Sequence, residues 1–279
     1  MFKNINYESS EKVLGELKGL ASKKLSEAKS MPKELYTSNE ILELEKKHIF
    51  SKEWVCAGRE KEIPNSGDYF TFQIDKQPIV ILRDENNNVK ALSNVCLHRM
   101  MKIVEGKGNK KRFTCPYHAW TYSLDGQLVM AKYMDKTDCF NKDDLKLPQI
   151  KCEVFLGWIY VSLNNNIQSV SSKLKELKEI ASPYAMEKYI DIISEDLTWD
   201  TNWKILTENF MEGYHLPVAH LGTVGPLINL LDTEFDKRGA FESFTYQKFT
   251  KNPDSLVGTA HKNNKILKGK WRHTSILPT

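Results

Sequence analysis

Two short segments, each with one cysteine and one histidine, constrain the fold of this chain more than any other feature of its sequence. The first pairs Cys96 with His98, and after sixteen intervening residues the second pairs Cys115 with His118. A structural zinc site usually takes two cysteines from one segment and two histidines from another. A mixed pair in each segment instead suits a two-iron cluster, in which the cysteines bind one iron and the histidines bind the other. The pattern therefore predicts two facing loops around an iron–sulfur cluster, with a structural zinc site as the alternative.

Short apolar runs separated by turn residues surround these two segments. Residues 69–72, 79–82 and 158–161 are rich in aromatic and β-branched side chains and predict strands. The turn sequences Asn86-Asn87-Asn88 and Asp125-Gly126 are typical of tight hairpins. Residues 105–109 predict a further hairpin between the two metal-binding segments. We therefore expect residues 46–162 to form one small all-β domain.

The regions on either side of this domain have different residue patterns, several of them helical. Residues 8–30 predict an amphipathic helix, and a capping-box pattern at residues 37–40 predicts the start of a second one. We therefore expect N-terminal helices over residues 1–45. Residues 163–190 predict an exposed charged helix, residues 192–199 a strand, and a further helix starts near residue 203. Strands are expected near residues 241–250 and 270–278, so that residues 163–279 form a second domain.

Composition excludes several classes of protein. The 279 residues carry a net charge of +4, and 41% of them are hydrophobic, which is ordinary for a globular chain. The small positive charge is spread along the chain, so we expect no nucleic-acid partner. No run of about 18 apolar residues is present, and the N-terminus lacks the apolar region of a secretory signal. Five cysteines without a secretory signal indicate free thiols or metal ligands, and we expect a cytoplasmic protein without a membrane span.

A second candidate metal site lies within residues 202–220. Glu212 and His215 are three residues apart, which places them about one turn apart on the same face of a helix. His215 and His220 are five apart, and on a straight helix their directions would differ by about 140°. Pro217 predicts a break in the helix that lets His220 turn back toward His215. Two histidines and a carboxylate form the facial triad of non-haem Fe(II) oxygenases, whereas the alternative is a helix with two incidental histidines.

These residues carry a resemblance to a known family. The first region is similar to the Rieske [2Fe–2S] domain at the following positions: Cys96-x-His98, Cys115-x2-His118, Ala119-Trp120-Thr121-Tyr122 and Asp125-Gly126. The run from Asn209 to His220 resembles the catalytic motif of Rieske non-haem iron oxygenases, in the terminal (alpha) component. Within that family the run is most similar to members that act on quaternary amines of the carnitine, choline or betaine type. The resemblance covers about residues 30–279.

The resemblance implies an assignment for each motif residue. Cys96, His98, Cys115 and His118 are expected to hold the Rieske cluster, and the family's two imidazole ligands of mononuclear Fe(II) match His215 and His220. Glu212 matches the carboxylate that bridges the iron site to a Rieske histidine of a neighbouring subunit, a position at which many members have Asp. The family's third iron ligand is an Asp about a hundred residues beyond His220, so we expect a C-terminally incomplete copy. Five acidic residues follow His220, none at the family's position: Asp232, Glu234, Asp236, Glu242 and Asp254.

The resemblance also implies a fold and a function. The expected fold class is α+β, with a small all-β Rieske domain and a helix-grip catalytic domain of an antiparallel sheet and helices. Electrons from NAD(P)H are expected to arrive through a separate reductase or ferredoxin, and O2 to hydroxylate or demethylate a small organic substrate. A homotrimer, or a multiple of it, is implied. The alternatives are a Rieske electron carrier without oxygenase activity, a zinc-stabilised binding module, or an oxygenase for aromatic rings.

Overall fold

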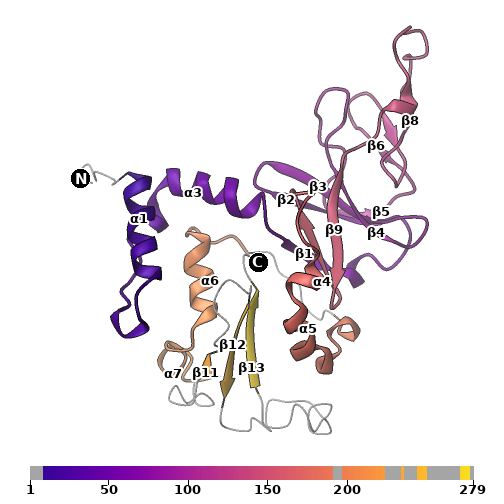
Figure 1. Ribbon diagram of the computed structural model, residues 1–279. Helices are drawn as coiled ribbons and strands as arrows, with labels where there is room; N and C mark the ends of the chain where they lie inside the picture. The colour runs from indigo at the N-terminus through magenta and orange to yellow at the C-terminus, as the bar shows by residue number, and fades with distance from the viewer. Residues whose placement is uncertain (1–8, 191–196, 224–233, 236–243, 250–270, 277–279) are drawn as a thin grey trace. The chain divides into compact units, whose positions relative to one another are not determined.

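The chain divides into two compact units, and Figure 1 colours it from its N-terminus to its C-terminus. The computed structural model describes residues 9–190, 197–223, 234–235, 244–249 and 271–276. The first unit, here called the mixed unit, combines Met1–Ile49 with Ile193–Leu277. The second, here called the β unit, comprises Phe50–Ile192 with Pro278–Thr279. Two segments far apart in the sequence thus build the mixed unit.

The β unit is built on a seven-stranded antiparallel sheet in the order β1-β10-β9-β4-β3-β2-β5, beside a three-stranded sheet in the order β6-β7-β8. Two short helices, α4 and α5, follow the last strand. The bounds of its elements are β1 Val55–Arg59, β2 Asp68–Ile74, β3 Gln77–Arg83, β4 Val89–Ser93, β5 Lys107–Asn109, β6 Phe113–Thr114, β7 Thr121–Tyr122, β8 Leu128–Met130, β9 Gln149–Phe155, β10 Trp158–Ser162, α4 Val170–Lys173 and α5 Lys175–Ala181.

Strand β3 lies between two apolar cores because its side chains alternate between the two faces of the sheet. Ile79 and Ile81 pack in one core, and Val80 and Leu82 pack in the other. All four are at most 1% exposed. The core of Val80 and Leu82 also contains both cysteines of the sequence motif, together with Trp120 and Tyr122. The candidate metal loops are therefore seated directly on the hydrophobic core of the β unit.

The mixed unit contains helices and a three-stranded antiparallel sheet in the order β11-β12-β13. The N-terminal helices pack around Val13, Leu35 and Ile41. The bounds of its elements are α1 Ser10–Ala21, α2 Glu34–Thr37, α3 Asn39–Glu45, α6 Trp203–Met211, α7 Leu216–Ala219, β11 Glu234–Phe235, β12 Phe244–Phe249 and β13 Trp271–Ile276. A π-helical turn, Lys46–Phe50, follows α3.

Most of the predicted strands and hairpins are confirmed. The three apolar runs correspond to β2, β3 and β10, and the two turn sequences connect β3 to β4 and β7 to β8. Asn87 and Gly126 adopt positive φ angles of 66° and 89°, as such tight turns require. The helix near residue 203 and the strands near residues 241–250 and 270–278 are also present as α6, β12 and β13. The predicted strand at 192–199 lies largely outside the described residues.

Two local predictions are wrong. Residues 105–109 form no hairpin, because Gly106 turns the chain with a φ of 66° and Lys107–Asn109 then pairs with β2 as the edge strand β5. The first helix ends at Ala21 and does not continue to residue 30. The hydroxyl of Ser22 donates to the carbonyl of Gly19 at 2.9 Å, which competes with continuation of the helix.

The start of α3 is confirmed, but its cap differs from the predicted capping box. Ser38 is the cap, and its hydroxyl accepts the backbone N–H of Ile41 at 3.4 Å. Thr37 belongs instead to the end of α2, where its hydroxyl donates to the carbonyl of Lys33. Among the residues that the structure describes, no helix combines the length and apolar character that crossing a membrane requires.

Candidate functional site

The two cysteine–histidine segments of the β unit fold into loops with the same backbone hydrogen bonds. The amide of Cys96 donates to the carbonyl of Met101, and the amide of Met100 donates to the carbonyl of Cys96. Cys115 makes the equivalent pair with Trp120 and Ala119. The residue four positions after each cysteine has a positive φ, 54° at Met100 and 59° at Ala119. Two loops of different sequence thus carry their candidate metal ligands on equivalent turns.

Asn94 closes the first loop from inside the core. Its side chain is fully buried, with its amide N–H donating to the carbonyl of Val104 at 2.8 Å and its amide oxygen accepting the N–H of Val104 at 3.0 Å. A buried backbone group without a partner is costly, so this double contact fixes residues 94–104 as one closed loop. Cys96 and His98 are carried within that loop.

We expect Asn94→Asp to destabilise the β unit and to reduce cluster content. A carboxylate cannot donate to the carbonyl of Val104, so one buried acceptor loses its partner, at a cost of about 1–3 kcal/mol, and more if the carboxyl is ionised. Urea unfolding and iron analysis measure both effects. Asn141→Asp is the matched control, because the Asn141 side chain only accepts a hydrogen bond there, from Asp143. Wild-type stability of Asn94→Asp would show that the double contact does not hold the loop.

The side chains of the four predicted cluster ligands lie at one end of these loops. Both cysteines are buried, with Cys96 1% and Cys115 2% exposed, while the rings of His98 and His118 lie 4.5 Å apart between centroids. Burial is the main cause that raises the pKa of the Cys115 thiol, followed by the neighbouring Cys96. Burial also lowers the pKa of His98, followed by the neighbouring His118.

An observation independent of the sequence motif indicates that these four side chains fit a Rieske cluster. The Nδ1 atom of His98 is buried and has no hydrogen-bond partner. A buried ring nitrogen without a partner is unfavourable unless it serves another purpose, such as binding a metal. The ring of His98 is also held in place, since Trp120 stacks on it at 4.9 Å with an angle of 8° between the planes. The paired thiols, the paired imidazoles and this unpaired nitrogen are those expected of a two-iron site.

Tyr122 contacts the first loop from the hydrophobic core. Its hydroxyl lies 3.3 Å from the Sγ of Cys96 and accepts the backbone N–H of Leu97 at 3.1 Å. The side chain is fully buried, and this burial, followed by its contact with Cys96, raises the pKa of the phenol. A neutral phenol thus lies against the sulfur that the sequence assigns to the cluster.

The second motif lies at the end of α6 in the mixed unit, and its backbone differs from the prediction. The helix ends at Met211, and Glu212 is already extended, with φ −121° and ψ 159°. Pro217 breaks no helix there but lies in the first turn of α7. The predicted shared helical face for Glu212 and His215 is therefore wrong. Glycine is a poor helix former, so Gly213, directly after Glu212, is the sequence signal for this end of the helix.

The side chains of this second motif nevertheless come together. The carboxylate of Glu212 accepts from the ring Nδ1 of His215, and it also accepts the backbone N–H groups of Tyr214 and His215. Burial on its own would raise the pKa of Glu212, but these hydrogen bonds outweigh it and hold the pKa below its usual value. The rings of His215 and His220 lie 5.4 Å apart between centroids, so the turn at 212–216 does bring His220 back toward His215.

The two sites provide their ligands in pairs. Within the described parts of the chain, no three side chains of histidine, cysteine, aspartate or glutamate gather as ligands of one ion. A Rieske cluster needs only two protein ligands at each iron. His215 and His220 would likewise be two ligands of a facial triad, and the acidic residues that follow His220 lie in β11 or outside the described residues. The three remaining cysteines, Cys56, Cys139 and Cys152, are free thiols.

Comparison with known proteins relates both sites to one family. The family model of the Rieske [2Fe–2S] domain matches residues 53–141, and that of the ring hydroxylating alpha subunit (catalytic domain) matches residues 184–275. The carnitine monooxygenase oxygenase subunit of Acinetobacter pittii (strain PHEA-2) is 34% identical over 196 residues, which cover 69% of this chain and 53% of that protein. The glycine betaine monooxygenase oxygenase subunit of Pseudomonas aeruginosa (strain UCBPP-PA14) is 35% identical over 192 residues, 68% of this chain and 44% of that protein.

A solved structure gives the same result for the fold. The quaternary ammonium Rieske monooxygenase CntA in complex with the inhibitor MMV12 superposes with a TM-score of 0.77 at 27% identity, over 90% of this chain and 66% of that one. The predicted α+β class, a Rieske domain followed by a catalytic domain with an antiparallel sheet and helices, is confirmed. The chain spans about half the length of the curated relatives it matches. It belongs to the family of Rieske non-haem iron oxygenase alpha subunits.

Proposed function

We propose that this protein is the terminal oxygenase component of a multicomponent system. A Rieske cluster on Cys96, His98, Cys115 and His118 would supply single electrons, and a mononuclear Fe(II) on His215 and His220 would activate O2 to hydroxylate or oxidatively demethylate a substrate. The observation that carries this proposal is the presence on one chain of two separate donor sets, each assembled within its own unit. An electron carrier would need only the first set.

In the proposal, some residues bind the cluster, and Glu212 both orients His215 and connects the two sites. The buried thiols of Cys96 and Cys115 keep one end of the cluster site away from water, while His118 is exposed and presents its ring to the outside of the β unit. Glu212 holds the ring of His215 through Nδ1, which leaves the opposite nitrogen directed away from the carboxylate. We propose that Glu212 also accepts a hydrogen bond from the ring N–H of His118 in a neighbouring subunit. One carboxylate would then join the two sites.

The partners and the substrate are part of the proposal. We propose a separate reductase or ferredoxin that passes on electrons from NAD(P)H, and a homotrimer, or a multiple of it, that brings Glu212 of one subunit to His118 of the next. The relatives named for carnitine and glycine betaine support a quaternary amine as the substrate class. Hydroxylation of an aromatic ring is the alternative, supported by the name of the matched catalytic domain. We also propose a cytoplasmic location, with which the free thiols of Cys56, Cys139 and Cys152 agree.

The second metal site is tested by His215→Ala and His220→Ala. Because the two donor sets lie in different units, we expect both variants to keep the visible spectrum of the Rieske cluster while they lose the additional iron and all oxygenation. Iron per chain and turnover with a compatible reductase, assayed on carnitine and on an aromatic acid, measure this. His48→Ala, an exposed histidine of the same unit, is the control. Loss of the cluster spectrum in a folded His215→Ala protein would contradict two independent sites.

A further inference from the structure

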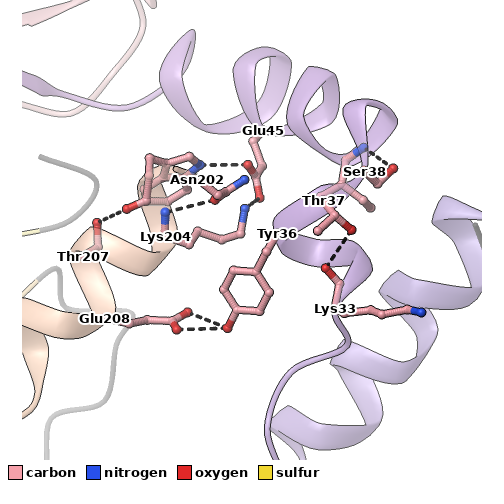
Figure 2. A network of polar contacts seen from close by, with 11 residues as sticks. Lys33, Tyr36, Thr37, Ser38, Glu45, Asn202, Lys204, Thr207 and Glu208 are labelled. Atoms are coloured by element: carbon pink, nitrogen blue, oxygen red, sulfur yellow. Dashed lines mark hydrogen bonds and ion pairs between the residues drawn. The ribbon is translucent and has the colours of Figure 1, made fainter. Parts of the chain in front are cut away.

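Helix α6, which leads into the second motif, is attached to the N-terminal helices by a buried carboxylate (Figure 2). One oxygen of Glu45 accepts from the Nε1 of Trp203 at 2.8 Å, and the other accepts from the Nζ of Lys204 at 2.6 Å. The side chains of this ion pair are only 10% and 13% exposed. An ion pair at this depth is screened little by solvent, and a single lost partner leaves a buried charge behind.

A second contact lies one helical turn farther along α6. The hydroxyl of Tyr36 donates to both carboxylate oxygens of Glu208, at 2.9 and 3.1 Å. Burial, followed by the hydrogen bond to Glu208, raises the pKa of Tyr36 to about 12, so the hydroxyl keeps its proton at neutral pH. Lys204 and Glu208 are four residues apart and therefore share one face of the helix. Both contacts thus act on the same face.

These contacts define the rotation of α6 about its own axis. The side chain of Asn202 caps the helix by accepting the N–H of Lys204 at 3.1 Å. Two α6 side chains that make neither contact, Ile205 and Phe210, are 46% and 61% exposed. A helix held at two successive turns along one face cannot turn about its axis without breaking both contacts. Glu212 is the first residue beyond the helix, so its direction follows from that rotation.

We propose that Glu45 and Tyr36 are positioning residues of the second metal site, which they reach through α6 by fixing where Glu212 meets His215. This inference rests on the proposed function, since it assigns a purpose to the segment that precedes the two histidines. The N-terminal helices then have a role in positioning the site as well as in packing the mixed unit. They supply the two groups that keep the carboxylate of Glu212 against the Nδ1 of His215.

The experiment compares Co(II) binding by the full chain and by three variants. Glu45→Gln keeps the volume of the side chain but loses its charge and one of its two acceptor oxygens, while Tyr36→Phe removes a single hydroxyl. Glu43→Gln is the matched control, because Glu43 lies on the same helix and pairs with Lys46 at 66% side-chain exposure. The dissociation constant and the visible band of bound Co(II) are measured well below the unfolding temperature, with the Rieske spectrum recorded on each sample.

We expect Glu45→Gln and Tyr36→Phe each to weaken Co(II) binding about 10-fold and to shift its visible band, since groups that orient a ligand affect affinity by roughly 10–100-fold. Glu43→Gln should bind as wild type, and all Rieske spectra should be unchanged. If Glu45→Gln does not fold, the Co(II) binding of Tyr36→Phe alone tests the positioning role. Co(II) binding equal to wild type in a folded Tyr36→Phe protein, with an unchanged band, overturns the positioning role. Failure of wild type itself to bind Co(II) through His215 and His220 overturns the proposed function instead.

Discussion

His98→Ala and Cys115→Ala should each abolish the Rieske cluster completely. In the proposal the two loops would hold two irons with two ligands each, so the loss of one ligand would leave an iron with a single protein bond and open the buried site to water. The unpaired Nδ1 of His98 has no other partner in the structure that could explain its burial. Iron and acid-labile sulfide content, together with the electron paramagnetic resonance (EPR) signal of the reduced protein, measure the loss.

The control for this prediction is Cys139→Ala. Cys139 is an exposed free thiol of the same unit, and its removal should leave the cluster intact. If His98→Ala and Cys115→Ala retained full iron and sulfide content and the same EPR signal, the assignment of these residues as cluster ligands would be refuted.

With iron in excess, Glu212→Gln should leave both metal sites largely occupied and slow electron delivery between them severely. Glutamine keeps the volume and one acceptor, but it loses the negative charge that holds the ring of His215 and, in the proposal, the ring of a neighbouring His118. Changes to a group that orients a metal ligand cost roughly 10–100-fold in affinity or activity. We therefore expect reoxidation of a pre-reduced cluster, in the presence of substrate and O2, to slow by at least about 10-fold.

Stopped-flow absorbance of the Rieske band in a single turnover measures this rate. Glu16→Gln, an exposed carboxylate of α1 in the same unit, is the control and should reoxidise as wild type. Reoxidation of Glu212→Gln at the wild-type rate would remove Glu212 from the electron route and leave it a surface carboxylate that caps a turn.

The sequence predicts the cluster loops well because their chemistry is local. Cys96 and His98 are two residues apart, and Cys115 and His118 are three apart, so spacing alone indicates which groups meet. Neighbouring turns such as Asp125-Gly126 are equally local and were predicted correctly. The sequence pattern does not identify the supporting residue Asn94, because an asparagine two residues before Cys96 shows neither its burial nor its hydrogen bonds to Val104.

The contacts that support the second motif cannot be predicted from sequence patterns. Tyr36 and Glu208 are 172 positions apart, and a capping pattern or a hydrophobic period carries no information about such a pair. The end of α6 differs from the prediction for another reason. A proline predicts the end of a helix, whereas α6 already ends before the extended Glu212, and Pro217 fits the first turn of the next helix. The proximity of Glu212 and His215 is predicted correctly, but on the wrong backbone.

The most direct test of two iron centres on one chain is the metal content of the anaerobically reconstituted protein, read together with its spectra. The account predicts a reddish-brown protein with a Rieske EPR signal after reduction and two sulfides for the cluster. It also predicts additional iron that His215→Ala removes without changing that signal. A colourless protein that binds zinc through Cys96, His98, Cys115 and His118 would contradict the account.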